Sequence, residues 1–223
     1  MIEYIHSNST VDVVDFVVKL INQHLDAGDR VLWLTSGGSN IAISVQIAEK
    51  LSIENSDNLY ISLVDERYGR LGHSSENWQQ LLDAGFEVTD SHPYRPLAED
   101  SGPETADNYG QWLDEQIDLA DISIGLFGIG SDGHTAGIKP RSSAVRSSET
   151  AIYYEWSDFQ RITMTPASIA KLDVAVIQAF GRDKDDTLRQ LLNSDVSIDD
   201  QPAQILKSLN RSILYTDYKE GKS

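Results

Sequence analysis

A glycine-rich loop near residue 130 contains the residue types best suited to acid–base chemistry. Residues 128–134 read Gly-Ile-Gly-Ser-Asp-Gly-His, so His134 follows an expected strand and has Asp132 two residues before it. A neutral imidazole at physiological pH can take a proton from water. A lone histidine more often has a structural role, but Asp132 and neighbouring glycines such as Gly133 favour a reacting centre around His134.

The same loop matches the dinucleotide-binding pattern G-x-G-x-x-G. That pattern belongs at the start of a helix that packs closely on its strand. Here Gly137 and Pro140 fall where the first helical turns would be. The sequence therefore favours glycines that shape a loop over a nicotinamide or flavin site.

A second glycine-rich segment, Ser36-Gly37-Gly38-Ser39-Asn40, lies between an expected strand and an expected helix. Free backbone N–H groups and the positive end of the helix dipole form an anion site at such a turn, and glycines allow close approach. An ordinary turn with Ser39 or Asn40 as the helix N-cap explains the same residues equally well. The segment is not a P-loop, because no Gly-Lys-Ser/Thr follows it.

An anionic ligand would require a local group of positive charges in this acidic chain. The chain has 35 acidic and 18 basic residues, which gives a net charge of −17. Arg67 ends the triplet Asp65-Glu66-Arg67 after one strand, Arg161 begins another, and Lys184 follows a third. Each is compatible with an ordinary surface charge. An anion site requires the fold to bring the three cations to one edge of the sheet.

Composition argues against several other functions. No Lys/Arg-rich run is present to bind nucleic acid or an acidic membrane surface. The chain has no cysteine, no G-x-S-x-G motif and no metal-ligand spacing among its histidines, so nothing in the sequence requires a metal. It also has no signal peptide and no apolar run long enough for a membrane span. We expect a cytoplasmic protein whose acidic surface fits a monomer.

Apolar runs that alternate with helical patterns predict an α/β fold: a doubly wound, mostly parallel, Rossmann-like sheet with helices on both faces. No linker or repeat divides the chain, so we expect one domain over residues 1–223. Ligands bind beyond the carboxyl ends of strands in such sheets. We expect strands at 30–35, 59–64, 122–127, 151–155, 161–165, 173–179 and 211–215, and helices at 11–25, 41–51, near 78–82, and at 104–120, 185–192 and 202–209.

Together, and in this order, the motifs resemble those of the 6-phosphogluconolactonase family, within the larger group that includes glucosamine-6-phosphate deaminases. The resemblance covers almost the whole chain, and residues 128–136 are its most specific part. The other matching segments are Ser36-Gly37-Gly38-Ser39, Asp65-Glu66-Arg67, Ser75-Glu76-Asn77, Arg161-Ile162-Thr163-Met164-Thr165, Gly181-Arg182-Asp183-Lys184 and Pro202-Ala203.

The resemblance implies a deaminase/lactonase-like fold without metal or organic cofactor. It implies hydrolysis of 6-phosphoglucono-1,5-lactone to 6-phosphogluconate, a step of the oxidative pentose phosphate pathway. By this similarity His134 is the general base, and Asp132 orients or tunes it. The residues implied to bind the sugar phosphate are Gly37, Gly38, Ser39, Asp65, Arg67, Gly133, Arg161 and Lys184, with Arg67 on the substrate or its developing oxyanion.

The sequence departs from the lactonase pattern at two places, and the first of them leaves the role of Lys139 open. The lactonases continue from D-G-H-T-A with Ser-Leu-Phe-Pro, whereas this chain has Gly137-Ile138-Lys139-Pro140. Asn40-Ile41 also replaces the usual Thr-Pro in the first glycine turn. Lys139 is compatible with an added phosphate or carboxylate contact and with a changed sugar preference.

Two other functions remain as alternatives. Deaminases resemble D-G-H-I-A-F-N-E-P in this loop, so Thr135 replaces their isoleucine and Lys139 replaces their catalytic glutamate. Loss of that acid argues against deamination. A non-catalytic sugar-phosphate sensor would need neither Asp132 nor His134, and the chain lacks a DNA-binding region.

Overall fold

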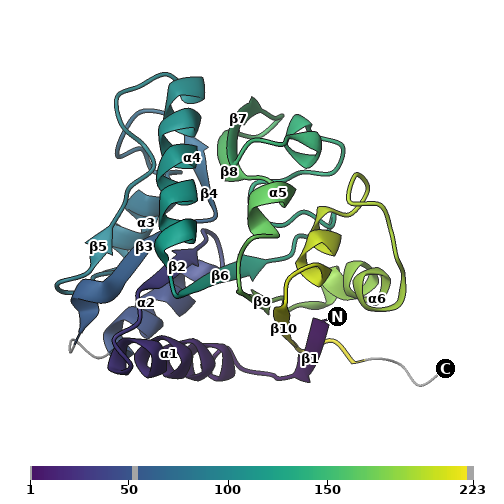
Figure 1. The fold of residues 1–223 in the computed structure, drawn as a ribbon. Coiled ribbons are helices and arrows are strands. Elements are labelled where there is room, and N and C mark those ends of the chain that lie inside the picture. Colours follow the sequence, from purple (N-terminus) through teal and green to yellow (C-terminus); the bar gives the residue numbers. More distant parts are fainter. Residues whose placement is uncertain (1, 52–54, 220–223) are drawn as a thin grey trace.

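The computed structural model describes residues 2–51 and 55–219. Within these residues seven parallel strands form the main sheet, in the order β1-β10-β9-β6-β2-β3-β5 (Figure 1). Its strands are β1 (Ile2–His6), β2 (Val31–Thr35), β3 (Leu59–Leu63), β5 (His92–Pro93), β6 (Ile122–Gly128), β9 (Val174–Gln178) and β10 (Arg211–Thr216).

The central strands are apolar because both of their faces are covered. Every residue of β2 and β9 is buried, as is typical of parallel strands between two layers of helices. Alternate side chains of β2 enter two separate cores: Val31 and Trp33 pack on one face, and Leu32 and Leu34 on the other.

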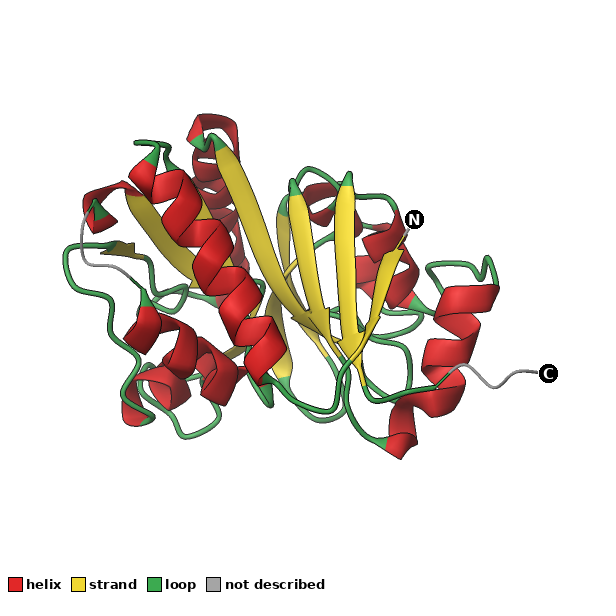
Figure 2. Cartoon of the chain, turned by 90° about the horizontal axis from the view of Figure 1, so that it is seen from below, coloured by secondary structure: helices red, strands yellow, loops and turns green. Residues whose placement is uncertain are grey.

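Helices pack on both faces, which confirms the predicted doubly wound α/β class. One face carries α1 (Val11–Asp26), α2 (Asn40–Lys50) and α3 (Asn77–Asp83). The other carries α4 (Gly102–Leu119), α5 (Pro166–Ile169) and α6 (Asp185–Asn193). Figure 1 shows α1 below the sheet and α4 and α5 above it, and Figure 2 shows helices in front of and behind the strands. Short 3₁₀ helices are η1 (Ser56–Asn58), η2 (Ser143–Arg146), η3 (Arg182–Lys184) and η4 (Pro202–Lys207).

A second, antiparallel sheet stands beside the main one and was not predicted. It consists of β4 (Asp65–Tyr68), β8 (Gln160–Met164) and β7 (Ala151–Glu155), in the order β4-β8-β7. The strands expected at 151–155 and 161–165 exist, but they belong to this sheet and not to the main one. The triplet Asp65-Glu66-Arg67 was not predicted to be a strand, because three consecutive charges lack the apolar pattern of a strand; its pairing with β8 makes it one.

Other differences concern short or marginal elements. The helix expected at 202–209 is the 3₁₀ helix η4, which begins at Pro202. Strands β1 and β5 and helix α5 were missed: β5 and α5 are very short, and β1 becomes a strand by pairing with β10 at the other end of the chain. Among the described residues, no helix is both long and apolar enough to cross a membrane.

Candidate active site

A cavity of about 360 Å³ lies beyond the carboxyl ends of β2, β3 and β6, at the edge of the sheet where ligands are expected. Segments far apart in the sequence meet there because parallel strands place their carboxyl ends at one edge. The lining residues are Ser36, Gly37, Gly38, Ser39, Asn40, Asp65, Arg67, Asn77, Gly128, Ile129, Gly130, Ser131, His134, Ala136, Arg161, Asp183 and Lys184.

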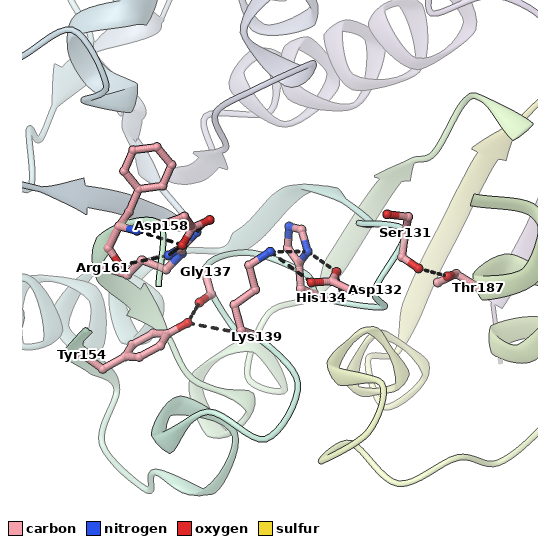
Figure 3. A network of polar contacts seen from close by, with 10 residues as sticks. Ser131, Asp132, His134, Gly137, Lys139, Tyr154, Asp158, Arg161 and Thr187 are labelled. Carbon is pink, nitrogen blue, oxygen red and sulfur yellow. Dashed lines mark hydrogen bonds and ion pairs between the residues drawn. The ribbon is translucent and has the colours of Figure 1, made fainter. Parts of the chain in front are cut away.

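Two charged groups contact the same nitrogen of the His134 imidazole (Figure 3). Its Nδ1 makes a short contact with Oδ1 of Asp132 and lies 3.0 Å from Nζ of Lys139. The same Nζ lies 3.1 Å from Oδ2 of Asp132. Within the described residues Nε2 of His134 has no hydrogen-bond partner. An Nδ1–H that donates to the Asp132 carboxylate leaves Nε2 as an acceptor, as a general base requires.

Asp132 is an anion in this arrangement. Partial burial raises the pKa of its carboxyl, but hydrogen bonds from the His134 ring and backbone N–H and from Lys139 lower the pKa overall, well below its ordinary value. The carboxylate therefore stays charged throughout the physiological pH range and can hold a protonated Nδ1.

Glycines let the loop wrap closely around the His134 ring. A Cβ on Gly130 would lie 2.1 Å from Nδ1 of His134, so no other residue fits there without moving the ring. Gly137 packs against β4 and β8: its N–H donates to Oγ1 of Thr163 at 3.0 Å, and a Cβ would lie 2.8 Å from Thr163 Cβ. The hydroxyl of buried Tyr154 donates to the Gly137 carbonyl and accepts from the Lys139 backbone N–H. These contacts fix the loop on both sides of the imidazole.

Two arginines enter the cavity from the second sheet. Arg67 and Arg161 are directly opposite each other in the β4–β8 pair. Arg161 is only 6% exposed and donates two hydrogen bonds to Asp158, at 2.7 and 2.9 Å. The ring of Phe159 lies 4.9 Å from the Arg67 guanidinium carbon and 5.5 Å from that of Arg161. The second sheet therefore positions a pair of cations that the main sheet alone would not hold.

The glycine turn after β2 has the geometry of an anion site. Gly38 adopts a φ of +62°, and the turn leads directly into α2. Within the described part of the chain, the N–H groups of Gly38 and Ser39 donate no hydrogen bond to the protein. Free N–H groups at a helix N-terminus favour an anion. Lys184 reaches the same cavity from η3 and supplies a third cation.

Asn77, at the start of α3, lines the cavity, and the buried Glu66 of β4 holds its backbone in place. Glu66 is fully buried and accepts from the backbone N–H groups of Arg67, Asn77 and Trp78 at 2.6, 2.6 and 2.9 Å. Burial raises the pKa of Glu66 to about 8, and these N–H groups oppose the rise. The contacts fix Asn77, whose side chain donates to the Asp65 carbonyl at 3.0 Å while its buried Oδ1 has no partner among the described residues.

Asp65 lies among the cations of this cavity. Burial raises the pKa of its carboxyl, and the charges of Arg67 and Arg161 oppose the rise. It is paired in register with Thr163 across β4 and β8.

Most of the predicted site residues meet at the cavity. The eight that line it are Gly37, Gly38, Ser39, Asp65, Arg67, His134, Arg161 and Lys184. Asp132 is not among the lining residues, but it contacts Nδ1 of His134; its orienting role stays a prediction.

Gly133 is the exception to the predicted binding set. It does not line the cavity: its N–H donates to the Gly130 carbonyl at 2.9 Å and its carbonyl accepts from Ala203 at 3.0 Å. With a φ of +85° and Gln201 packed against it, Gly133 shapes the turn and has no backbone group left for a ligand.

Two residues of this site were not predicted, and the contacts of a third were not. Asn77 falls within the matching motif Ser75-Glu76-Asn77 but was given no role. Asp158 lies three residues before Arg161, a weak signal that becomes an ion pair only through the turn between β7 and β8. Lys139 was noticed, but its contact with His134 could not be anticipated. The described residues hold no cluster of three or more histidine and acidic side chains suited to a metal ion.

The fold and cavity define a doubly wound α/β protein with a histidine–aspartate pair and a group of cations at the carboxyl edge of its main sheet. Residues 7–215 match the family described as glucosamine-6-phosphate isomerases/6-phosphogluconolactonase, and the chain belongs to this family. The family predicted from the motifs is thereby confirmed.

Individual relatives come from both branches of the family. The chain is 24% identical over 237 residues to a 6-phosphogluconolactonase of Borreliella burgdorferi, covering 99% of this chain and 98% of that protein. It is 25% identical over 218 residues to a glucosamine-6-phosphate deaminase of Oenococcus oeni, covering 90% and 89%. A crystal structure of a 6-phosphogluconolactonase from Shewanella baltica OS155 superposes with a TM-score of 0.81 at 17% identity, over 97% of this chain and 98% of that one. At that identity the superposition shows a shared fold.

Proposed function

We propose that this protein hydrolyses 6-phosphoglucono-1,5-lactone to 6-phosphogluconate, with His134 as the general base. The observation that carries the proposal is the His134 ring at the cavity: Asp132 holds Nδ1, and Nε2 is left without a partner in the described chain. The cations and the free N–H groups of the glycine turn lie in the same cavity. They suit a substrate that carries a phosphate at one end and a carbonyl at the other.

Phosphate binding would involve three kinds of donor. The turn at Gly38 and Ser39 offers backbone N–H groups, and Arg161 and Lys184 offer positive charge. Arg67, opposite Arg161, would hold the substrate or the oxyanion of the reacting carbonyl. Because the phosphate does not react, its binding energy fixes the ring relative to His134.

The reaction needs only water and proton transfer. Nε2 of His134 would take one proton from water while the water oxygen bonds to the lactone carbonyl carbon, which becomes a tetrahedral oxyanion. Collapse of this intermediate breaks the bond from that carbon to the ring oxygen. The imidazolium returns its proton to the departing ring oxygen, which becomes a hydroxyl. The product acid then loses its proton to solvent. The Asp132 carboxylate stabilises the imidazolium formed midway.

Deamination of glucosamine 6-phosphate is the second candidate, since relatives with that name match the chain. Lys139 disfavours it: its ammonium group lies 3.0 Å from His134 at the position where the deaminase pattern has a catalytic glutamate. A cation cannot supply the proton-accepting carboxylate of that pattern.

The deciding experiment compares hydrolysis of freshly generated 6-phosphogluconolactone by the wild type and His134→Ala, after subtraction of spontaneous opening. We expect a loss of about 10²- to 10⁴-fold, the usual contribution of a general base. Asp132 and Lys139 still pair without the ring, so the variant is expected to fold, as thermal unfolding would verify. Equal rates in the wild type and His134→Ala would contradict the role of His134 as the general base. Ammonia release from glucosamine 6-phosphate would favour the deaminase, and binding of 6-phosphogluconate without turnover would favour a sensor.

A further inference from the structure

Lys139 is buried against the catalytic pair and not against the ligand cavity. Its side chain is 14% exposed, and Nζ lies within 3.1 Å of Asp132 Oδ2 and 3.0 Å of His134 Nδ1. Lys139 is not one of the described residues that line the cavity. Its ammonium group thus contacts Nδ1 of the imidazole and not Nε2 (Figure 3).

We propose that Lys139 is a positioning residue that opposes protonation of His134, and so favours the neutral ring that can act as a base. It does so by occupying Oδ2 of Asp132 and by placing a positive charge beside Nδ1. Its effect on the charge of the ring follows from the geometry alone. Its effect on turnover rests on the proposed lactone hydrolysis.

Two opposite charges lie beside Nδ1 of His134. A carboxylate in contact with an imidazole favours the doubly protonated cation, which cannot act as a base. A nearby ammonium group disfavours that cation, because two like charges would lie about 3 Å apart. Lys139 thus opposes the effect of Asp132 on the protonation of the ring. Asp132 still accepts the hydrogen bond from Nδ1–H and so fixes the tautomer.

Other charged groups around the cavity also contribute to the electrostatic potential at the His134 ring. From β4 the ring faces Asp65 and Arg67, from β8 Arg161, and from η3 Asp183 and Lys184. Within the described structure none of these groups hydrogen-bonds to the ring nitrogens, whereas Lys139 and Asp132 both contact Nδ1. Removing Lys139 should therefore leave Asp132 as the dominant influence on the ring.

The first test is an NMR pH titration of the His134 ring in the ligand-free protein, with the resonance assigned by its loss in His134→Gln. In Lys139→Met we expect the midpoint of the titration to move to higher pH by about one unit, as for loss of a cation in contact with the ring. The control Lys171→Met removes the same charge from an exposed ion pair with Asp114, and its midpoint should not move. The same midpoint in Lys139→Met and Lys171→Met, or a lower one in Lys139→Met, overturns the proposal.

The second test measures kcat/KM for the lactone between pH 5 and pH 8. The acid limb of the profile should move to higher pH in Lys139→Met, with up to about a tenfold loss below the limb and a plateau within about twofold of wild type. A raised KM at every pH with an unmoved limb would make Lys139 a substrate ligand and overturn the proposal. If the wild type does not hydrolyse the lactone, the NMR titration still decides the role of Lys139.

Two further variants separate the effect of charge from that of geometry. Lys139→Gln keeps a donor for Asp132 without the charge, and it should shift the titration as Lys139→Met does. Lys139→Arg keeps the charge and should leave the titration near that of the wild type. A shift in Lys139→Arg as large as that in Lys139→Gln would show that geometry and not charge controls the ring, which contradicts the proposal. Thermal unfolding identifies any variant that fails to fold.

Discussion

Arg67 and Arg161 lie directly opposite each other across β4 and β8, in antiparallel register. Like charges in that position destabilise a sheet. Asp158 offsets one of them through two hydrogen bonds with Arg161, and Phe159 packs against both guanidinium groups. The remaining positive charge faces the cavity, which is where a phosphorylated substrate would compensate it.

Arg161→Met should weaken binding of the phosphorylated substrate. Loss of a charged hydrogen-bond donor to phosphate corresponds to about 1.5–3 kcal/mol, so we expect KM for 6-phosphogluconolactone to rise about 10- to 100-fold. Steady-state kinetics on this lactone and on the phosphate-free glucono-1,5-lactone provide the check, because the second substrate should show little change.

The matched control for that substitution is Arg146→Met. Arg146 is an exposed arginine paired with Asp199 away from the cavity, so its loss changes the net charge equally. Equal losses on both lactones in Arg161→Met would show that Arg161 does not act through the phosphate.

Asp158 should make the stability of the protein sensitive to acid. The hydrogen bonds from Arg161 lower the pKa of Asp158 to about 2, from an ordinary value of 3.8. A group with a depressed folded-state pKa stabilises the protein above its unfolded pKa and loses that effect as pH falls through the folded one. The stability difference between the wild type and Asp158→Asn should thus be constant above about pH 5 and shrink towards pH 2. Urea unfolding of both proteins at several pH values measures it; a difference that stays constant down to pH 2.5 would contradict the ion pair.

Gly130→Ala should impair catalysis more than folding. The new methyl group would lie 2.1 Å from Nδ1 of His134 and 2.7 Å from Oδ1 of Asp132, so the ring must move. Displacement of a catalytic group by about 1 Å costs roughly 100-fold in rate, whereas overpacking costs about 1–3 kcal/mol in stability. Lactone hydrolysis and thermal unfolding separate the two effects.

Gly110→Ala is the control for that change. Gly110 lies in α4, and a Cβ there would make contacts of 3.4 Å or longer with Ala151 and Thr150. Its rate should equal that of wild type. A Gly130→Ala protein with wild-type rate would show that the position of the ring is not critical.

The sequence by itself determined the parts of the fold that depend on local pattern. Apolar runs such as 122–127, followed by glycines and then by helical spacing, specify buried strands that end in loops, and this pattern indicates an α/β sheet. Because parallel strands align their carboxyl ends, the same pattern also indicated where residues such as Ser39 and His134 would meet. The glycines at 128–134 also indicated a tight loop, because glycine is the residue that lets the backbone approach neighbouring groups so closely.

Only the tertiary structure decided which charges face one another. β4 is a strand because β8 pairs with it, and that pairing sets Arg67 opposite Arg161 from almost a hundred residues away. Asp158 and Arg161 form an ion pair because a turn folds the chain back between β7 and β8. Lys139 reaches Nδ1 of His134 because Gly137 packs on Thr163 and redirects the loop. Such contacts arise from packing between distant segments, and no local preference of the residues encodes them.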